Sequence, residues 1–307
     1  MALLFVQAPL AFVAVALLLG LLVGSFLNVV IYRLPIMLER EWRAECATLA
    51  SDEAHTRTLP AALAGADAGP AFNLVTPRSA CPHCQAPIRA WQNIPVLSWL
   101  WLGGKCASCR APISGRYPVV ELVTGLLTAA VAWKFGFGWT AACGMLLTWF
   151  LVALTGIDLD HKLLPDTLTL PLMWLGLLAS VAGLAAPGVV LPVTPPQSIL
   201  GAAIGYGSLW SVYQLFRLIT GKEGMGYGDF KLLAALGAWL GVGLLLPVVL
   251  ISATVGALTG VLLILTGRQA RGQTMPFGPY LAAAGWIALM WGPELVTGYL
   301  GYFHPVR

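Results

Sequence analysis

No charged residue interrupts the stretch PLAFVAVALLLGLLVGSFLNVVI, which runs from Pro9 to Ile31. About 20 consecutive apolar residues are enough for a helix to cross the hydrocarbon core of a bilayer. A cleavable signal peptide would instead place positive charge before a shorter apolar run. Here Arg33 and other charged residues follow the run, and no Lys or Arg precedes it. We therefore predict an uncleaved first transmembrane helix whose N-terminus lies outside the cytoplasm.

The rest of the chain is similarly apolar. Of its 307 residues, 58% are hydrophobic and only 10% are charged, whereas a soluble domain has about 25% charged residues. We predict an all-α polytopic membrane protein with about eight transmembrane helices. Within 230–266 only Gly241, Gly243 and Pro247 suggest a break. After the first run, the predicted spans are 119–136, 139–157, 168–187, 198–219, 230–247, 248–266 and 279–299.

Between the first two spans lies a polar segment that includes an Ala/Gly-rich stretch, Pro60 to Pro70, typical of a surface loop. We expect residues 1–32 to form the first transmembrane helix, 33–117 a small cytoplasmic domain, and 118–307 the membrane core. With 33–117 inside, alternation leaves 15 of the 17 Lys and Arg residues in cytoplasmic segments, with Lys134 and Arg307 outside. This distribution follows the positive-inside rule. The net charge of +4 then indicates contact with membrane lipid headgroups and requires no nucleic-acid partner.

Four of the six cysteines form a short repeat. Cys81-Pro-His-Cys84 and Cys106-Ala-Ser-Cys109 are each followed by two residues and Pro-Ile. Two such turns supply four thiolates, the ligand set of a closed structural zinc site. A reducing compartment favours metal over disulfides. Free or redox-active thiols are the alternative, and His83 is a spare ligand candidate; Cys46 and Cys143 are isolated.

Two acidic clusters adjoin predicted spans. Gly156-Ile-Asp158-Leu-Asp160-His-Lys-Leu-Leu-Pro-Asp166 follows the third span, and Gly224-Met-Gly226-Tyr-Gly228-Asp229-Phe-Lys231 opens the sixth. The predicted topology puts both clusters at the cytoplasmic membrane face. Two carboxylates in a poorly hydrated site tend to share a proton, which suits general acid and base attack of water on a peptide bond. The glycines before Asp229 allow a tight turn and close approach.

Structural roles remain open for each carboxylate. Asp160 could pair with Lys162 or His161, and Asp166 follows a proline as a helix N-cap would. Asp158 could be an interfacial cap, and Asp229 could sit at a helix N-terminus where the dipole favours an anion. Chemistry alone does not choose between Asp158 and Asp160.

The whole chain resembles the type IV prepilin peptidases, which are leader peptidases and N-methyltransferases of bacterial inner membranes. The resemblance is carried by Gly24-Ser-Phe-Leu-Asn-Val-Val-Ile-Tyr-Arg-Leu-Pro35, the doubled CxxC, Arg116-Tyr-Pro-Val-Val-Glu121, Asp158 to Asp166, and Gly226-Tyr-Gly228-Asp229. The last motif is the GxGD signature of membrane aspartyl proteases such as presenilin.

The resemblance implies an aspartic endopeptidase with Asp158 and Asp229 as its catalytic pair. It would cut the leader from prepilins of type IV pili and pseudopilins of type II secretion at the cytoplasmic face. Methylation of the new N-terminus from S-adenosylmethionine would follow, with 33–117 as the proposed methyltransferase region. We expect Gly226, Gly228, Asp160 and Lys231 to support the catalytic loops, and Cys81, Cys84, Cys106 and Cys109 to bind zinc. The residues that bind the methyl donor are not identified by any motif.

Two other functions compete with this hypothesis. A proton-coupled transporter would relay protons through its carboxylates, but its polar residues would lie near mid-membrane and its chain would show repeats. A scaffold that uses the zinc domain to bind a secretion apparatus would leave the pairing of Asp158 with Asp229 unexplained.

Overall fold

A computed structural model of the chain describes residues 5, 7–53, 72–185, 193–222, 224–268 and 275–303. The stretch Pro60 to Pro70, Arg271, Arg307 and residues 186–192 lie outside these residues. The described part is helical, as predicted, and its extended pairing is limited to two isolated bridges, Ala80 with Pro87 and Lys105 with Pro112.

Within the described residues, eight long helices and two short ones follow one another along the chain. They are α2 (Pro9–Glu53), η1 (Ala90–Asn93), α3 (Leu97–Trp101), α4 (Arg116–Phe135), α5 (Trp139–His161), α6 (Asp166–Ala185), α7 (Pro195–Thr220), α8 (Tyr227–Leu240), α9 (Val242–Leu265) and α10 (Gly278–Phe303). Five of them, α2, α4, α5, α6 and α9, contain stretches long and apolar enough to cross a membrane. The chain is therefore an integral membrane protein.

Two helix boundaries differ from those expected. Helix α2 does not end near Ile31 but continues through Pro35 to Glu53. The break in 230–266 falls at Gly241, not near Pro247, so that α8 has 14 residues and α9 has 24. Gly241 has a φ of +74°, which an L-residue adopts only with strain, and the chain turns there. Pro247 stays inside α9 as its sixth residue, where it removes one intrahelical hydrogen bond but does not end the helix.

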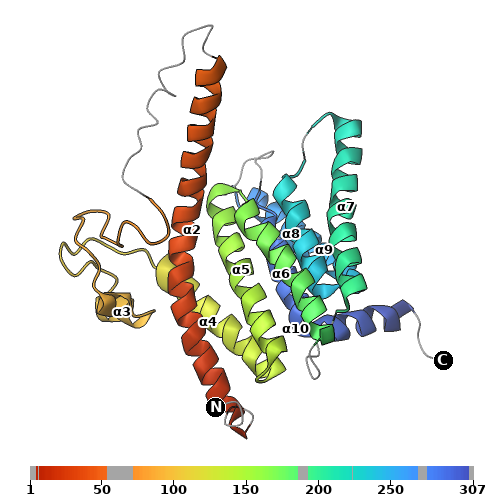
Figure 1. The fold of residues 1–307 in the computed structure, drawn as a ribbon, viewed down its shortest axis with the longest axis horizontal. Helices are drawn as coiled ribbons and strands as arrows, with labels where there is room; N and C mark the ends of the chain where they lie inside the picture. The colour runs from red at the N-terminus through yellow and green to blue at the C-terminus, as the bar shows by residue number, and fades with distance from the viewer. Residues whose placement is uncertain are drawn as a thin grey trace. The chain divides into compact units, whose positions relative to one another are not determined.

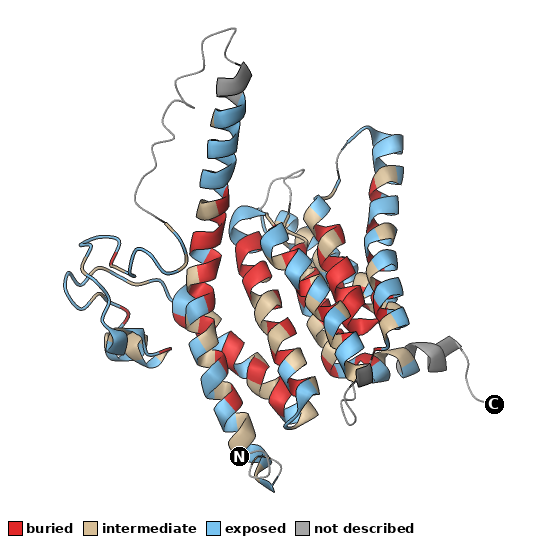
Figure 2. Cartoon of the chain, in the orientation of Figure 1, coloured by how far each residue is buried: buried red, intermediate tan, exposed pale blue. Residues whose placement is uncertain are grey.

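The chain divides into two compact units. One comprises residues 1–20 and 124–307, and the other comprises residues 21–123. In the first unit, α6, α7, α9 and α10 pack around α8, and α5 packs on α6 and α10. Phe230 and the residues from Leu232 to Leu240 of α8 are buried (Figures 1 and 2). The connections from α5 to α6, from α7 to α8 and from α9 to α10 lie at the same end of these helices (Figure 1).

Glycines let α7 approach α8 at backbone contact. A methyl group added to Gly201 on α7 would collide with the carbonyl oxygen of Gly237 on α8, and one added to Gly237 would collide with that of Gly201. One turn further along α7, a methyl group on Gly205 would lie 2.6 Å from the carbonyl oxygen of Leu233. Such small-residue seams are how membrane helices gain close packing where no hydrophobic effect drives association.

Gly201→Ala should therefore destabilise the protein by about 1–3 kcal/mol, because the obstructing atoms belong to backbone that cannot rotate away. The matched control is Gly207→Ala on the same helix, where an added methyl group has open space. That change should leave stability unaltered or raise it by up to about 1 kcal/mol. Thermal unfolding in detergent measures both variants, and equal unfolding temperatures would contradict the role of the seam.

Candidate active site and metal-binding segment

Asp158 lies in the last turn of α5 and is only 5% exposed. The helix ends three residues later, because Lys162 adopts a left-handed conformation and its N–H donates to the Asp158 carbonyl oxygen at 2.9 Å. The Asp158 carboxylate accepts a hydrogen bond at 2.9 Å from the backbone N–H of Gly278, the first residue of α10. An N–H at the start of a helix compensates an anion that the negative end of α5 would disfavour.

Asp229 lies in the first turn of α8 and is 7% exposed. Gly226 is the N-cap residue of α8, in an extended conformation, and its carbonyl oxygen accepts from the Asp229 N–H at 3.3 Å. Leu164 lies against Gly228, the neighbour of Asp229, and against Gly278, which contacts Asp158, so the two carboxylates, 71 residues apart in sequence, border the same corner of the structure. The structure thus brings together the two aspartates named from the sequence.

Leu164 packs between the loops that carry the aspartates. A methyl group on Gly228 would lie 2.7 Å from Leu164 Cβ, and one on Gly278 would lie 2.6 Å from Asp158 Oδ2 and 3.1 Å from Leu164 Cδ2. Gly228 and Gly278 therefore permit α8 and α10 to begin against the end of α5. Gly278 was not among the residues that the sequence suggested. Its signal is the run Pro276-Phe-Gly-Pro279 at the start of the last apolar stretch.

The other predicted support residues behave differently from one another. Asp160 is exposed, whereas its neighbour Asp158 is buried, which distinguishes two carboxylates that chemistry alone did not. Lys231 donates to both carboxylate oxygens of Asp166, at 2.6 and 2.7 Å. Asp166 is the first residue of α6, so this ion pair joins the starts of α6 and α8. Asp166 was considered as a helix N-cap, but its carboxylate serves this longer-range pair.

The four cysteines of the repeat converge on one point. Their sulfur atoms all lie within 4.8 Å of one another, with Cys81 Sγ 3.8 Å from Cys109 Sγ and Cys84 Sγ 4.0 Å from Cys106 Sγ. An ion bound tetrahedrally at about 2.3 Å separates its thiolates by about 3.8 Å. The cluster could therefore hold a metal ion. His83 is exposed and is not a member of this group.

The repeat in sequence is a repeat in conformation. The N–H of each first cysteine, Cys81 or Cys106, donates to the carbonyl oxygen five residues later. The fourth residue after each first cysteine, Gln85 or Arg110, has a left-handed φ. Each turn directs backbone N–H groups at its first sulfur.

These N–H groups favour the thiolate form of both first cysteines. Hydrogen bonds from the amides of Cys84 and His83 lower the pKa of Cys81. Those from the amides of Cys109 and Ser108 lower the pKa of Cys106 to about 6. Since the thiolate is the form that binds metal, both turns are arranged for ligation.

Taken together, the fold and the site define an integral membrane protein with two buried aspartates beside one corner of its core and a four-thiol cluster that could hold a metal ion. Residues 18–135 match the family model described as Bacterial Peptidase A24 N-terminal domain, and residues 145–261 match that of the Type IV leader peptidase family. The chain therefore belongs to the type IV leader peptidase family.

Several relatives match nearly the full chain, and each is named prepilin leader peptidase/N-methyltransferase. A protein of Stutzerimonas stutzeri is 54% identical over 96% of both chains. One of Pseudomonas aeruginosa is 53% identical over 96% of this chain and 95% of its own. One of Aeromonas hydrophila is 54% identical over 96% of both. No solved structure matches the chain.

We expect the purified protein to contain about one metal ion per chain, and Cys81→Ser or Cys109→Ser to lose most of it, because a closed site needs all four ligands. The matched controls are Cys46→Ser and Cys143→Ser, since neither cysteine belongs to the cluster. Elemental analysis measures the ion. Full metal content in the Cys81 or Cys109 variants would exclude the four-thiolate site.

Proposed function

We propose that this protein removes the leader peptide of type IV prepilins and then methylates the new N-terminus with S-adenosylmethionine. The observation that carries the peptidase half is the meeting of Asp158 and Asp229 in one buried site at the ends of α5 and α8. Both aspartates lie at helix ends and not at mid-helix, unlike the relay of a proton-coupled transporter. Membership of the family and the names of the relatives support the same conclusion.

The proposed chemistry is acid and base catalysis by the pair. One aspartate, in its ionised form, accepts a proton from the attacking water, and the other, protonated, assists the carbonyl oxygen or the leaving nitrogen. The N–H of Gly278 holds Oδ2 of Asp158 and leaves its second oxygen for water. Gly226 and Gly228 allow α8 to start beside α5, and Lys231 fixes that start through Asp166. We propose no catalytic role for Asp160, which is exposed.

The substrates that we propose are prepilins of type IV pili and the related pseudopilins of type II secretion. We further propose that residues 33–117 contribute the methyltransferase region and residues 118–307 the peptidase core. The separate family models for 18–135 and 145–261 support such a division.

For the ion we propose zinc. Four thiolates in a tetrahedral arrangement are typical of structural Zn²⁺, and four protein ligands leave no open position for catalysis. Cys81, Cys84, Cys106 and Cys109 would hold it and thereby join two turns that have no other core between them.

We propose the bacterial inner membrane as the location, with the N-terminus in the periplasm and the zinc segment and aspartates on the cytoplasmic side. The distribution of Lys and Arg supports this orientation. Lys134, predicted to lie outside, pairs at 3.1 Å with Glu294, which lies in the second half of α10. Asp158 instead bonds to the first residue of α10. The two contacts therefore lie toward opposite ends of α10, which agrees with Lys134 outside and the aspartates inside.

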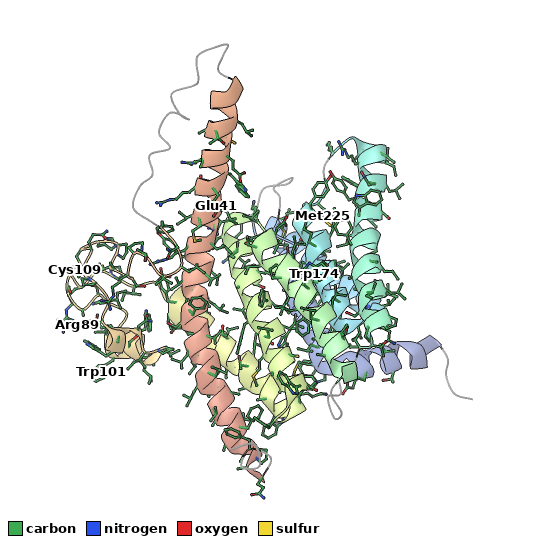
Figure 3. All side chains as sticks on the ribbon, viewed as in Figure 1. Glu41, Arg89, Trp101, Cys109, Trp174 and Met225 are labelled. Carbon is green, nitrogen blue, oxygen red and sulfur yellow. The ribbon has the colours of Figure 1, made fainter. Side chains whose placement is uncertain are left out.

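We propose membrane lipid as a further partner, and we propose no nucleic-acid partner. Residues 72–120 contain five basic residues and no acidic one. Exposed apolar side chains accompany them, among them Leu97, Leu100 and Trp101, the last 83% exposed. Figure 3 shows Arg89, Trp101 and Cys109 on this same segment. Tryptophan beside basic residues is the composition of a surface that meets anionic headgroups.

Asp158→Asn and Asp229→Asn should each reduce cleavage of a purified prepilin at least about 100-fold, because each removes one partner of an acid–base pair. Asp160→Asn is the matched control and should retain most of the activity, since Asp160 is exposed. Methylation of a peptide that already lacks its leader should survive in all three variants. Normal cleavage by the Asp158 or Asp229 variant would refute the catalytic assignment.

Gly278→Ala should also impair cleavage, by about 10- to 100-fold, because its methyl group would displace Oδ2 of Asp158 from its N–H partner. Gly243→Ala, where an added methyl group meets nothing, serves as the control for a glycine at a helix start. The cleavage rate and the unfolding temperature should be measured together. A Gly278 variant with a normal rate would show that this contact does not position Asp158.

A further inference from the structure

Two sequence motifs that the peptidase chemistry does not use meet in the structure. Ser25 and Asn28 belong to the motif 24–35 on α2, and Tyr117 and Glu121 belong to the motif 116–121 on α4. Asn28 Nδ2 donates to the carbonyl oxygen of Tyr117 at 3.1 Å, and the Ser25 side chain hydrogen bonds to Glu121. All four residues belong to the same compact unit, where they form a polar seam between two membrane-capable helices.

Glu121 is the chemically active group of this seam. It is the only acidic residue between positions 72 and 157, and it is 9% exposed. Its described partners are neutral: the Ser25 hydroxyl and the Val96 N–H, which donates to Glu121 Oε2 at 2.7 Å. A carboxylate in a membrane helix is costly unless it serves a function or pairs with a cation. The seam therefore offers a buried carboxyl group whose ionised form a cationic ligand would stabilise.

The hydrogen bond from the Val96 N–H to Glu121 coincides with a strained backbone conformation at Val96. Val96 has a φ of +59° and a ψ of −49°, a region in which a β-branched residue is an outlier. It directly precedes α3, and its N–H points at Glu121. Such outliers persist where the surrounding structure fixes them, and they concentrate at functional sites.

We propose that Glu121 receives the N-terminal ammonium of the cleaved peptide and accepts its proton before methyl transfer. This inference rests on the proposed methyltransferase function. The new N-terminus is a cation near neutral pH, with an ordinary pKa of about 8. A buried carboxylate beside the half-buried Ser25 is complementary to that cation in charge.

The reaction balances with the sulfonium methyl donor, S-adenosylmethionine, as second substrate. Glu121 takes one proton from the ammonium and leaves a neutral amine. The nitrogen lone pair forms the new N–C bond while the C–S bond breaks, and its electrons remain on sulfur as a thioether. The methylated product is again a cation, so that the proton held by Glu121 can pass to water.

A purely structural role for Glu121 makes a different prediction. If the residue only fastens Val96, glutamine would serve almost as well, because its side-chain oxygen also accepts a hydrogen bond. Glutamate and glutamine should differ in activity only if the role of position 121 requires a group that can carry a negative charge and take up a proton. Glu121→Gln is therefore the decisive substitution, and Glu121→Asp is the conservative variant that keeps the carboxylate.

The experiment measures methylation of a synthetic peptide that begins at the mature N-terminal residue of a prepilin, using full-length protein in detergent. Glu121→Gln should lower kcat for methylation at least about 100-fold, as for loss of a general base. Its cleavage rate, metal content and unfolding temperature should stay normal. Glu121→Asp should recover part of the loss. Glu39→Gln, at an exposed position of α2 in the same unit, is the matched control and should behave as the unchanged protein.

A second substrate separates proton removal from binding. A peptide whose N-terminal residue carries two fluorine atoms on its β-carbon has a much less basic amine, mostly neutral at pH 7, and Glu121→Gln should methylate it nearly as fast as the unchanged protein does. Normal methylation of the ordinary peptide by Glu121→Gln would overturn the proposal. Parallel loss of metal and cleavage would overturn it too, in favour of a structural role. If the unchanged protein methylates neither peptide, the proposed methyltransferase function itself fails.

Discussion

Backbone contact between α7 and α8 is the constraint on which the rest of the membrane core depends. Because Gly201 faces Gly237 and Gly205 faces Leu233, α7 approaches α8 without intervening side chains. The short helix α8 can then be buried along its whole length beneath α6, α7, α9 and α10. Its first turn carries Asp229, so the packing of an apolar helix determines where a carboxylate is placed.

The aspartate site also depends on glycines that leave space for neighbouring side chains. Leu164 fills the corner at which α5 ends, and Gly228 and Gly278 leave room for it. The left-handed Lys162 ends α5 directly after Asp158, so that the carboxylate reaches the first N–H of α10. The site thus requires the end of α5 and the starts of α8 and α10 to lie together. A methyl group added at Gly228 or Gly278 would push them apart.

Features that depend on local sequence could be predicted. Apolar runs revealed the long helices, and the CxxC repeat revealed two turns that the structure shows to be alike in hydrogen bonding. The predicted end of α8 was wrong because Gly241 and Pro247 were both plausible breaks. The structure places the break at Gly241, and α9 continues through Pro247. The extension of α2 through Pro35 was missed for a similar reason.

Features that depend on distant contacts could not be predicted. Nothing in the sequence pairs Lys231 with Asp166, 65 residues away, or Gly278 with Asp158, 120 residues away. The preference for Asp158 over Asp160 came from family resemblance, and the structure adds a physical reason for it. Asp158 faces the packed interior from the last turn of α5, whereas Asp160, two positions further on, faces away from it.

Two of the three buried carboxylates to which we assign chemistry, Asp158 and Glu121, are held by backbone N–H groups. Gly278 donates to Asp158, and Val96 donates to Glu121. A lysine or arginine partner would stabilise the ionised form and hold the carboxylate in it. An N–H orients one oxygen, adds no full charge, and leaves the group able to take up and release a proton. The opposite choice is seen for Asp166, whose two oxygens are both bonded to Lys231. An ion pair of that kind suits the fixing of helix starts, and the same reasoning makes Asp166 a poor candidate for proton transfer.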